Sequence, residues 1–221
     1  MTVKRSETVS SPAASPRLLA IGDIHGCRRP LQALLDQVKP TVDDTLVFLG
    51  DYIDRGPDSA GVITDLLELR ARLPHCVFLR GNHEQMLLDL LAGADGTTFL
   101  LNGGGRTIAS YEARGAWPPP DEHVGFIEQL PLWYETEAFI FTHAGLRPER
   151  SLAEQIADDL LWIRAEFLNS SHDWGKPVVF GHTPLPVPLL TATRIGLDTG
   201  CVYGGKLTCC DLLTRHCWQS G

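Results

Sequence analysis

Five short apolar runs in this chain each end in acidic, amide or imidazole side chains. The stretches are "RLLAIGDIHG", "TLVFLGDYIDRG", "CVFLRGNHE", "FIFTHAG" and "PVVFGHT". Any one of these polar residues has an ordinary explanation as a turn residue, a helix cap or a structural histidine. Their recurrence at five successive run ends favours a shared site instead. The candidate residues are Asp23, His25, Asp51, Asn82, His143 and His182.

The chemistry that suits this set is the binding of two divalent metal ions. In an extended stretch, Asp23 and His25 lie on the same side and can bind one ion. The two oxygens of Asp51 can bridge both ions, and the amide of Asn82 with the two later histidines would complete the second. Mixed nitrogen and oxygen ligands suit Mn, Fe or Zn better than Ca or Mg. Such a pair binds a phosphoryl oxygen and lowers the pKa of a shared water, so that hydroxide attacks phosphorus.

Two further tasks of phosphate-ester hydrolysis need side chains that do not bind metal. His83, in "GNHE", is the best candidate for the general acid that protonates the leaving oxygen, and Asp54 is placed to orient its imidazole. Arg55 offers a planar guanidinium that can hold a phosphate through two hydrogen bonds, and Arg164 in "LLWIR" is a second candidate. Other interpretations stay open, because Arg55 could pair with a nearby aspartate and Arg164 could lie on an exposed helix.

The elements that would position these residues follow from the hydrophobic pattern. The five apolar runs have the length and the flanking glycines of strands that are buried on both faces. Amphipathic helix patterns at residues 31–38, 62–67 and 82–91 follow the first three runs. Alternating strands and helices indicate an α/β fold with parallel strands, whose carboxyl ends meet along one edge of the sheet. This topology would bring the candidate residues together.

The remaining segments predict the rest of the fold. Residues 95–131 contain "NGGGR" and "WPPP" but no strand-like run, so we expect short helices and loops there. From residue 189 onward, short β-type runs separated by glycine predict a second, antiparallel sheet. A single two-sheet domain is expected over residues 17–221. Residues 1–16 are rich in Ser, Pro, Thr and Ala and are expected to form a disordered tail.

The composition excludes several classes of function. Of the 221 residues, 43% are hydrophobic and 21% are charged, which is ordinary for a globular protein with a sizeable core. The formal net charge of -8 argues against binding to duplex nucleic acid. The apolar runs are too short to cross a membrane, and the start of the chain lacks a secretory apolar segment. The six cysteines show no zinc-ligand spacing, so we expect reduced thiols in a cytoplasmic protein.

The ordered motifs "GDIHG", "GDYIDRG", "RGNHE", "THAG" and "GHT" resemble the signature of the phosphoprotein phosphatase family within the metallophosphoesterases. The resemblance covers residues 22–183. Matched motif by motif, it implies that the family's metal ligands and catalytic residues are the candidate residues named above, each in the role described for it there. It implies two β-sheets flanked by helices, a four-layer arrangement. It also implies a dinuclear centre, usually of Mn or Fe, that hydrolyses phosphoserine and phosphothreonine in proteins.

Three interpretations of the function remain. The leading one is a serine/threonine protein phosphatase of the compact bacterial and phage type, which acts on phosphorylated proteins or peptides without an obligate regulatory subunit. Symmetrical dinucleoside tetraphosphatases have a similar metal cradle, but many replace the second aspartate of "GDYIDRG", which this chain keeps as Asp54. A catalytically silent metal-binding protein is the third, and it would be expected to lack a ligand or a catalytic residue; none is missing. Neither nucleic acid nor a membrane is expected as a partner.

Overall fold

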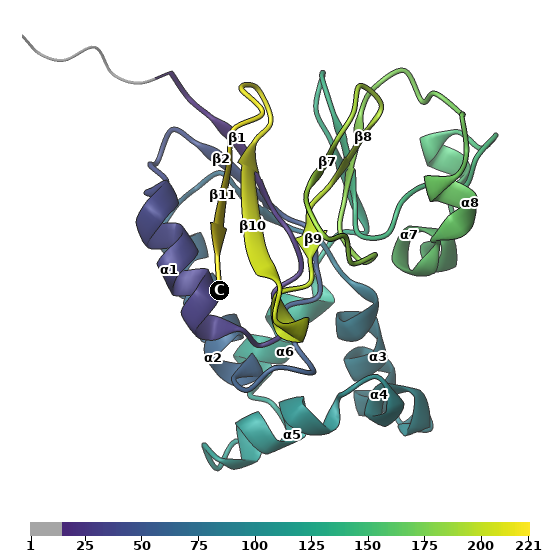
Figure 1. The fold of residues 1–221 in the computed structure, drawn as a ribbon. Coiled ribbons are helices and arrows are strands. Elements are labelled where there is room, and N and C mark those ends of the chain that lie inside the picture. Colours follow the sequence, from purple (N-terminus) through teal and green to yellow (C-terminus); the bar gives the residue numbers. More distant parts are fainter. Residues whose placement is uncertain (1–14) are drawn as a thin grey trace, which may run out of the picture.

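The computed structural model describes residues 15–221, so nearly all of the predicted tail lies outside the described residues. Two mixed β-sheets pack face to face (Figure 1). Sheet A has the strand order β11-β10-β1-β2-β3, with β9 also paired to β10. Its strands are β1 (Leu18–Ile21), β2 (Thr45–Phe48), β3 (Cys76–Phe78), β9 (Asp198–Thr199), β10 (Lys206–Asp211) and β11 (Cys217–Ser220).

Sheet B has the strand order β4-β5-β6-β8-β7. Its strands are β4 (Trp133–Glu135), β5 (Ile140–Thr142), β6 (Val178–Phe180), β7 (Leu189–Leu190) and β8 (Arg194–Gly196). The five predicted core strands are all present, and they divide between the sheets, with β1, β2 and β3 in sheet A and β5 and β6 in sheet B.

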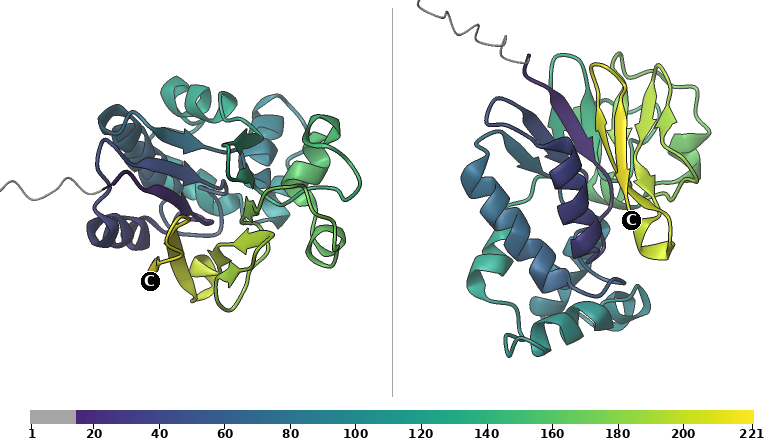
Figure 2. Two further views of the ribbon diagram at one scale, coloured as in Figure 1. Left: turned by 90° about the horizontal axis from the view of Figure 1, so that it is seen from above. Right: turned by 60° about the vertical axis from the view of Figure 1, so that its left-hand side comes forward.

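Helices lie on both sides of the paired sheets and at one end of them (Figures 1 and 2). Helices α1 and α2 cover sheet A, and α7 and α8 lie beside sheet B. The first four helices are α1 (Arg28–Val38), α2 (Ser59–Arg72), α3 (Asn82–Leu91) and α4 (Thr97–Leu101). The others are α5 (Gly105–Glu112), α6 (Asp121–Glu128), α7 (Ala157–Trp162) and α8 (Ala165–Leu168), with 3-10 turns η1 (Leu152–Glu154) and η2 (Cys201–Tyr203).

Alternate residues of each strand pack on opposite faces, as the two-residue period of a strand requires. In β1, Leu19 and Ile21 join the apolar core beneath α1 and α2, whereas Ala20 joins the core between the sheets. In β6, Val179 faces the inter-sheet core and its two neighbours join a third core with α7 and α8. Three apolar layers therefore separate four structural layers, which confirms the predicted α/β fold class of two sheets flanked by helices.

The strand register places the site loops side by side. Strands β1, β2 and β3 are parallel, and Ile21 pairs with Phe48, which pairs with Phe78. The three strands therefore end at the same level. Strands β5 and β6 are also parallel. Each set of loops that carries the candidate residues thus leaves its sheet at one edge.

The C-terminal strands do not form a separate antiparallel sheet, so that prediction was wrong. Strand β8 pairs in parallel with β6, and β10 pairs antiparallel with β1. Strand β8 forms hydrogen bonds with the free side of β6, and β10 does the same for β1. In a separate sheet these two strands would have left the backbone N–H and C=O groups of β6 and β1 unpaired. Sheet A becomes a mixed sheet because β10 is antiparallel to β1, and sheet B is mixed because β4 is antiparallel to β5 and β7 is antiparallel to β8.

Two cysteines depart from the prediction of reduced thiols. Cys210 and Cys217 face each other across the β10–β11 pair and form a disulfide. Cys27, Cys76, Cys201 and Cys209 are free thiols. Within residues 15–221, no helix combines the length and apolarity that a membrane span needs.

Candidate metal centre

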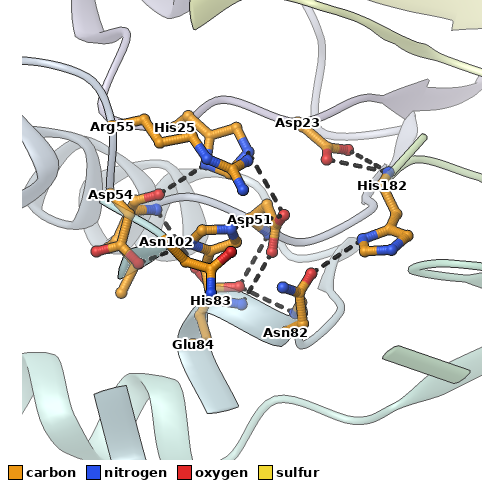
Figure 3. A network of polar contacts seen from close by, with 12 residues as sticks. Asp23, His25, Asp51, Asp54, Arg55, Asn82, His83, Glu84, Asn102 and His182 are labelled. Carbon is orange, nitrogen blue, oxygen red and sulfur yellow. Dashed lines mark hydrogen bonds and ion pairs between the residues drawn. The ribbon is translucent and has the colours of Figure 1, made fainter. Parts of the chain in front are cut away.

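The loops that follow β1, β2, β3, β5 and β6 each bring buried polar side chains to one cluster at the end of the two sheets (Figure 3). The predicted metal-binding side chains are all buried, with at most 4% of each residue exposed. They come from positions as far apart as Asp23 and His182, which are 159 residues apart and hydrogen-bonded. The structure therefore brings the predicted ligand set into one region.

Asp51 lies at the centre of the cluster, and its two oxygens face different histidines. Its Oδ1 is 3.4 Å from Nε2 of His143, and its Oδ2 is 3.5 Å from Nε2 of His25. Ligand atoms of Asp51, His25 and His83 form one compact group, and those of Asp51, His143 and His182 form another. Because Asp51 belongs to both groups, its carboxylate is placed to bridge two ions.

Backbone carbonyls fix the orientation of two of these imidazoles. The Nδ1 atom of His25 donates to the carbonyl of Ile53 at 2.9 Å, and Nδ1 of His143 donates to the carbonyl of Leu49 at 2.8 Å. A carbonyl can only accept, so each ring carries hydrogen on Nδ1. The Nε2 atoms, which face the cluster, are the available ligand atoms.

Asn82 and His182 complete the second group. The Oδ1 atom of Asn82 lies 2.9 Å from Nε2 of His143 and 3.0 Å from Nδ1 of His182. Nε2 of His182 is buried and has no hydrogen-bond partner among residues 15–221. Oxygen and nitrogen ligand atoms thus converge here from the start of α3 and from the ends of β5 and β6.

Asp23 stands slightly apart from the two compact groups. Its two oxygens accept the backbone N–H of His182 at 3.1 and 3.0 Å (Figure 3). The neighbouring Gly181 permits this approach, because a Cβ there would collide with Oδ1 of Asp23. Burial raises the pKa of Asp23 well above its usual range, and the negative charge of Asp198 adds to the shift. A nearby cation would offset the electrostatic cost of ionising this buried carboxylate.

The electrostatics of the cluster favour bound cations. Burial lowers the pKa of His25 to about 3 and that of His182 to about 2, so both rings are neutral. Burial also acts on Asp51, but the charges of His143 and His83 outweigh it and hold the pKa of Asp51 well below its usual range. Burial acts to lower the pKa of His143, but the charge of Asp51 raises it to about 9, so this ring holds a proton that a bound cation would displace. Neutral imidazoles and ionised carboxylates are the forms that bind metal. The two groups therefore fit a dinuclear divalent metal centre.

His83 and Asp54 form a separate buried pair beside the centre. Nδ1 of His83 lies 2.6 Å from Oδ2 of Asp54, and neither side chain is exposed to solvent. Nε2 of His83 lies 3.9 Å from Oδ2 of Asp51 and has no hydrogen-bond partner in the part of the chain that the structure describes. Since Asp54 engages Nδ1, the free Nε2 is the atom that faces the cluster, as a general acid requires.

The two predicted arginines differ in their placement. Nη1 of Arg55 lies 2.6 Å from Nε2 of His25, so its guanidinium reaches into the cluster (Figure 3). It does not take the alternative pairing with Asp58, which binds other arginines. Arg164 has an exposed side chain. Burial is the main cause of the lowered pKa of His182, and the positive charges of His143 and Arg164 lower it further.

Strained backbone concentrates at this site. Eight non-glycine residues of the described chain have positive φ, a conformation that costs about 1 to 3 kcal/mol each when the surroundings enforce it. Five of them are residues of the predicted site, namely His25, Asp51, Asp54, Arg55 and His182. Such strain persists only where many contacts hold the loop, so the centre is preorganised.

Sequence reasoning gave no role to Glu84, which holds the Asp51 loop. Its carboxylate accepts the backbone N–H groups of Asp51 at 2.9 Å, Tyr52 at 2.8 Å and Gly81 at 2.9 Å. A Cβ at Gly81 would collide with Oδ1 of Asp51. Glu84 stands three residues after the N-cap Gly81, where the glutamate of a capping box would stand, and this spacing could have identified it although glycine has no side chain to form the other half of the motif.

Two exposed aromatic residues near the centre were also missed. The Trp162 ring meets the His182 ring edge-on at 6.1 Å, and Trp162 is 36% exposed. The Tyr203 ring lies 5.7 Å from the guanidinium carbon of Arg55, and Tyr203 is 61% exposed. These positions depend on how α7 and η2 fold back toward the centre, so spacing in the sequence could not predict them.

The two-sheet sandwich with paired His and Asp clusters at its strand ends defines the class of metallophosphoesterases. The model of the family described as calcineurin-like phosphoesterase matches residues 16–216, and the chain therefore belongs to this family. Serine/threonine-protein phosphatase 1 of Salmonella typhimurium is 35% identical over 205 residues, which cover 85% of this chain and 88% of that protein. The resemblance to phosphoprotein phosphatases is thus confirmed.

Other relatives carry a different activity in their names. The asymmetrical bis(5'-nucleosyl)-tetraphosphatase PrpE of Bacillus cereus is 29% identical over 216 residues, covering 85% of this chain and 87% of that protein. A crystal structure provisionally described as a diadenosine tetraphosphatase is 28% identical, covers 95% of both chains and has a TM-score of 0.72. The chain is a phosphoesterase, and its relatives include enzymes named for two kinds of substrate.

Proposed function

We propose that this protein hydrolyses phosphoserine and phosphothreonine in proteins. The observation that carries the proposal is the buried His83–Asp54 pair, whose hydrogen bond is 2.6 Å long. A serine or threonine alkoxide is a strongly basic leaving group, and a positioned general acid accelerates its departure by about 10² to 10⁴. A nucleotide leaving from a phosphoanhydride is far less basic and needs less help. The 35% identity to a bacterial protein phosphatase supports the same choice.

The proposed metal ligands divide at Asp51. One ion would be held by Asp23, His25 and Asp51, and the other by Asp51, Asn82, His143 and His182. Two divalent ions, Mn most readily and Fe or Zn as alternatives, would supply positive charge to the phosphoryl oxygens and lower the pKa of a water.

The protein's own residues perform the remaining steps. Arg55 binds the phosphoryl oxygens through its guanidinium, which already reaches the cluster beside His25. Arg164, whose side chain is exposed, adds a second positive charge for the same group. His83 holds a proton on Nε2 and transfers it to the leaving oxygen, while Asp54 keeps the imidazole in this orientation.

Steady-state hydrolysis of two substrates tests the proposal. With Mn added, the purified protein should release phosphate from a phosphothreonine peptide with a higher kcat/KM than it shows for diadenosine tetraphosphate. A His83→Asn variant tests whether the turnover belongs to this site. No peptide turnover, together with rapid cleavage of diadenosine tetraphosphate, would overturn the proposal.

A dinucleoside tetraphosphatase is the second candidate, and the exposed rings of Trp162 and Tyr203 favour it. Aromatic side chains stack on nucleobases, and these two lie beside His182 and Arg55 at the centre. The Bacillus relatives are named as asymmetrical enzymes, whereas the sequence motifs suggested the symmetrical kind. The nucleotides released from diadenosine tetraphosphate would separate these two activities.

A further inference from the structure

The carboxylate of Asp54 has a second partner that lies far away in the sequence. While Oδ2 of Asp54 bonds to His83, its Oδ1 accepts the hydroxyl hydrogen of Thr107 at 2.5 Å. Thr107 belongs to α5, is fully buried and lies 53 residues beyond Asp54. The carboxylate is therefore held at both oxygens, by the imidazole on one side and by a hydroxyl on the other.

The same hydroxyl also holds the backbone of Asp54. Oγ1 of Thr107 accepts the Asp54 N–H at 2.9 Å and lies 2.9 Å from Oγ of Ser59. A hydroxyl has one hydrogen, and that of Thr107 goes to Asp54, so Ser59 must be the donor in the second contact. Thr107 thus uses its one donor and both lone pairs, and two of its three bonds go to Asp54.

This clamp acts on strained backbone. Asp54 and Arg55 have φ values of +70° and +66°, in the left-handed region that residues other than glycine rarely adopt. The carbonyl of Gly103, in the loop between α4 and α5, accepts the Arg55 N–H at 3.2 Å. One short segment, residues 103–107, therefore holds both the residue that orients His83 and the residue proposed to bind phosphate.

We propose that Thr107 is a positioning residue for the His83–Asp54 pair. The proposal rests on the proposed role of His83 as general acid. Without the hydroxyl, the Asp54 carboxylate loses one of its two partners, and the imidazole loses its fixed direction. Proton delivery to the leaving oxygen then becomes slower, while phosphate binding is little changed. Residues 95–131, whose role the sequence did not reveal, would owe part of their function to this support.

The test measures the hydrolysis of two aryl phosphates by variants with single substitutions in α5. Phenyl phosphate has a basic leaving group that needs a general acid, and p-nitrophenyl phosphate has a weakly basic one that does not. Thr107→Val removes the hydroxyl and keeps the shape, and Thr107→Ser restores it. Ser110→Ala is the matched control, because Ser110 is a buried hydroxyl of α5 that bonds to Ala60 and Asp58 instead.

We expect Thr107→Val to lower kcat for phenyl phosphate by about 10 to 100-fold, the usual effect of losing a supporting hydrogen bond. Its kcat for p-nitrophenyl phosphate should fall by less than about threefold, with KM unchanged for both. Thr107→Ser and Ser110→Ala should keep nearly full activity. Equal losses on the two substrates, or no loss on phenyl phosphate, would overturn the proposal.

Two provisions keep the result decisive. If Thr107→Val does not fold, Ser59→Ala weakens the same clamp from α2, and unchanged turnover of phenyl phosphate in that variant would overturn the proposal. The aryl phosphates contain neither peptide nor nucleotide. If the wild-type protein does not hydrolyse phosphopeptides, the proposed substrate class is refuted, but the test of Thr107 with aryl phosphates remains valid.

Discussion

His83 and Asp54 are joined by a 2.6 Å hydrogen bond between Nδ1 and Oδ2, and both side chains are completely buried. This pair lies directly beside Asp51, whose Oδ2 is 3.9 Å from the free Nε2 of His83. The spacing of "GDYIDRG" therefore separates two tasks. One aspartate occupies the centre of the candidate metal site, and the other supports the proposed proton donor.

Asp51→Asn should abolish the binding of both ions, because both groups of ligand atoms share this carboxylate. His143→Asn should remove only the second ion. Elemental analysis of desalted protein, loaded with Mn, measures the number of ions per chain. Asp36→Asn, an exposed change on α1, is the control. An Asp51→Asn variant that retains both ions would contradict the bridging role.

Removal of metal by a chelator should abolish phosphoesterase activity, and addition of Mn should restore it. The ions would supply the charge that the phosphoryl oxygens require. Activity against p-nitrophenyl phosphate, recorded before chelation, after it and after Mn addition, measures the effect. Full activity in protein that elemental analysis finds free of metal would rule out this account of the site.

Glu84→Gln should weaken both folding and metal binding. The glutamine NH₂ group would face backbone N–H donors of Asp51, Tyr52 or Gly81 that now donate to the carboxylate. Each unpaired buried group costs about 1 to 3 kcal/mol. Urea unfolding and Mn titration measure the two effects, with Glu68→Gln, at an exposed position on α2, as the control. Unchanged Mn affinity would show that Glu84 does not position Asp51.

Arg55→Lys should raise KM for a phosphopeptide by about tenfold or more with a smaller change in kcat, because an ammonium cannot form the two parallel hydrogen bonds of a guanidinium. Steady-state kinetics with the peptide measure this split. Arg72→Lys, an exposed change near the end of α2, provides the comparison. If KM stayed at the wild-type value, the phosphate would have to be bound by other groups.

Asp44 should contribute stability that disappears in acid. Burial opposes its ionisation, but hydrogen bonds from Arg17 and Thr41 outweigh burial and lower the pKa of Asp44 to about 2. The unfolded value is about 3.9, so the contribution is complete above pH about 4 and is lost as the pH falls through about 2. Asp44→Asn should cost about 2 kcal/mol at neutral pH and progressively less in acid.

Urea unfolding of wild type and Asp44→Asn from pH 7 downward measures this difference. Asp43→Asn is the control, since Asp43 is the exposed neighbour of the buried Asp44. A stability difference between wild type and Asp44→Asn that stays constant down to pH about 2 would mean that the Arg17 ion pair does not stabilise the fold.

The sequence predicted most of the centre because its residues stand directly after parallel strands. His143 and His182, for example, follow β5 and β6 immediately or by one glycine, so the period and ends of the strands fixed their positions. Thr107 could not be found in this way. Its contact with Asp54 forms only because α5 packs beside α2. That packing cannot be predicted from the spacing of residues in the sequence.

The arrangement of the C-terminal strands was also beyond local pattern. Strands β8 and β10 read alike as short β-type runs, yet one joins β6 in sheet B and the other joins β1 in sheet A. Alternation of apolar and polar residues predicts that a strand has one buried face, but it does not predict which neighbouring strand it pairs with. The predicted fold class was therefore correct, and the assignment of these strands to a sheet of their own was not.

The effect of His83→Asn on two substrates tests the central claim most directly. The claim is that His83 delivers a proton to a basic leaving oxygen. We predict that this variant keeps its fold and its bound metal, and that kcat for a phosphothreonine peptide falls by about 10² to 10⁴. The loss on p-nitrophenyl phosphate should be less than about tenfold, because its leaving group needs little protonation. Equal losses on both substrates, or full peptide turnover, would contradict the account.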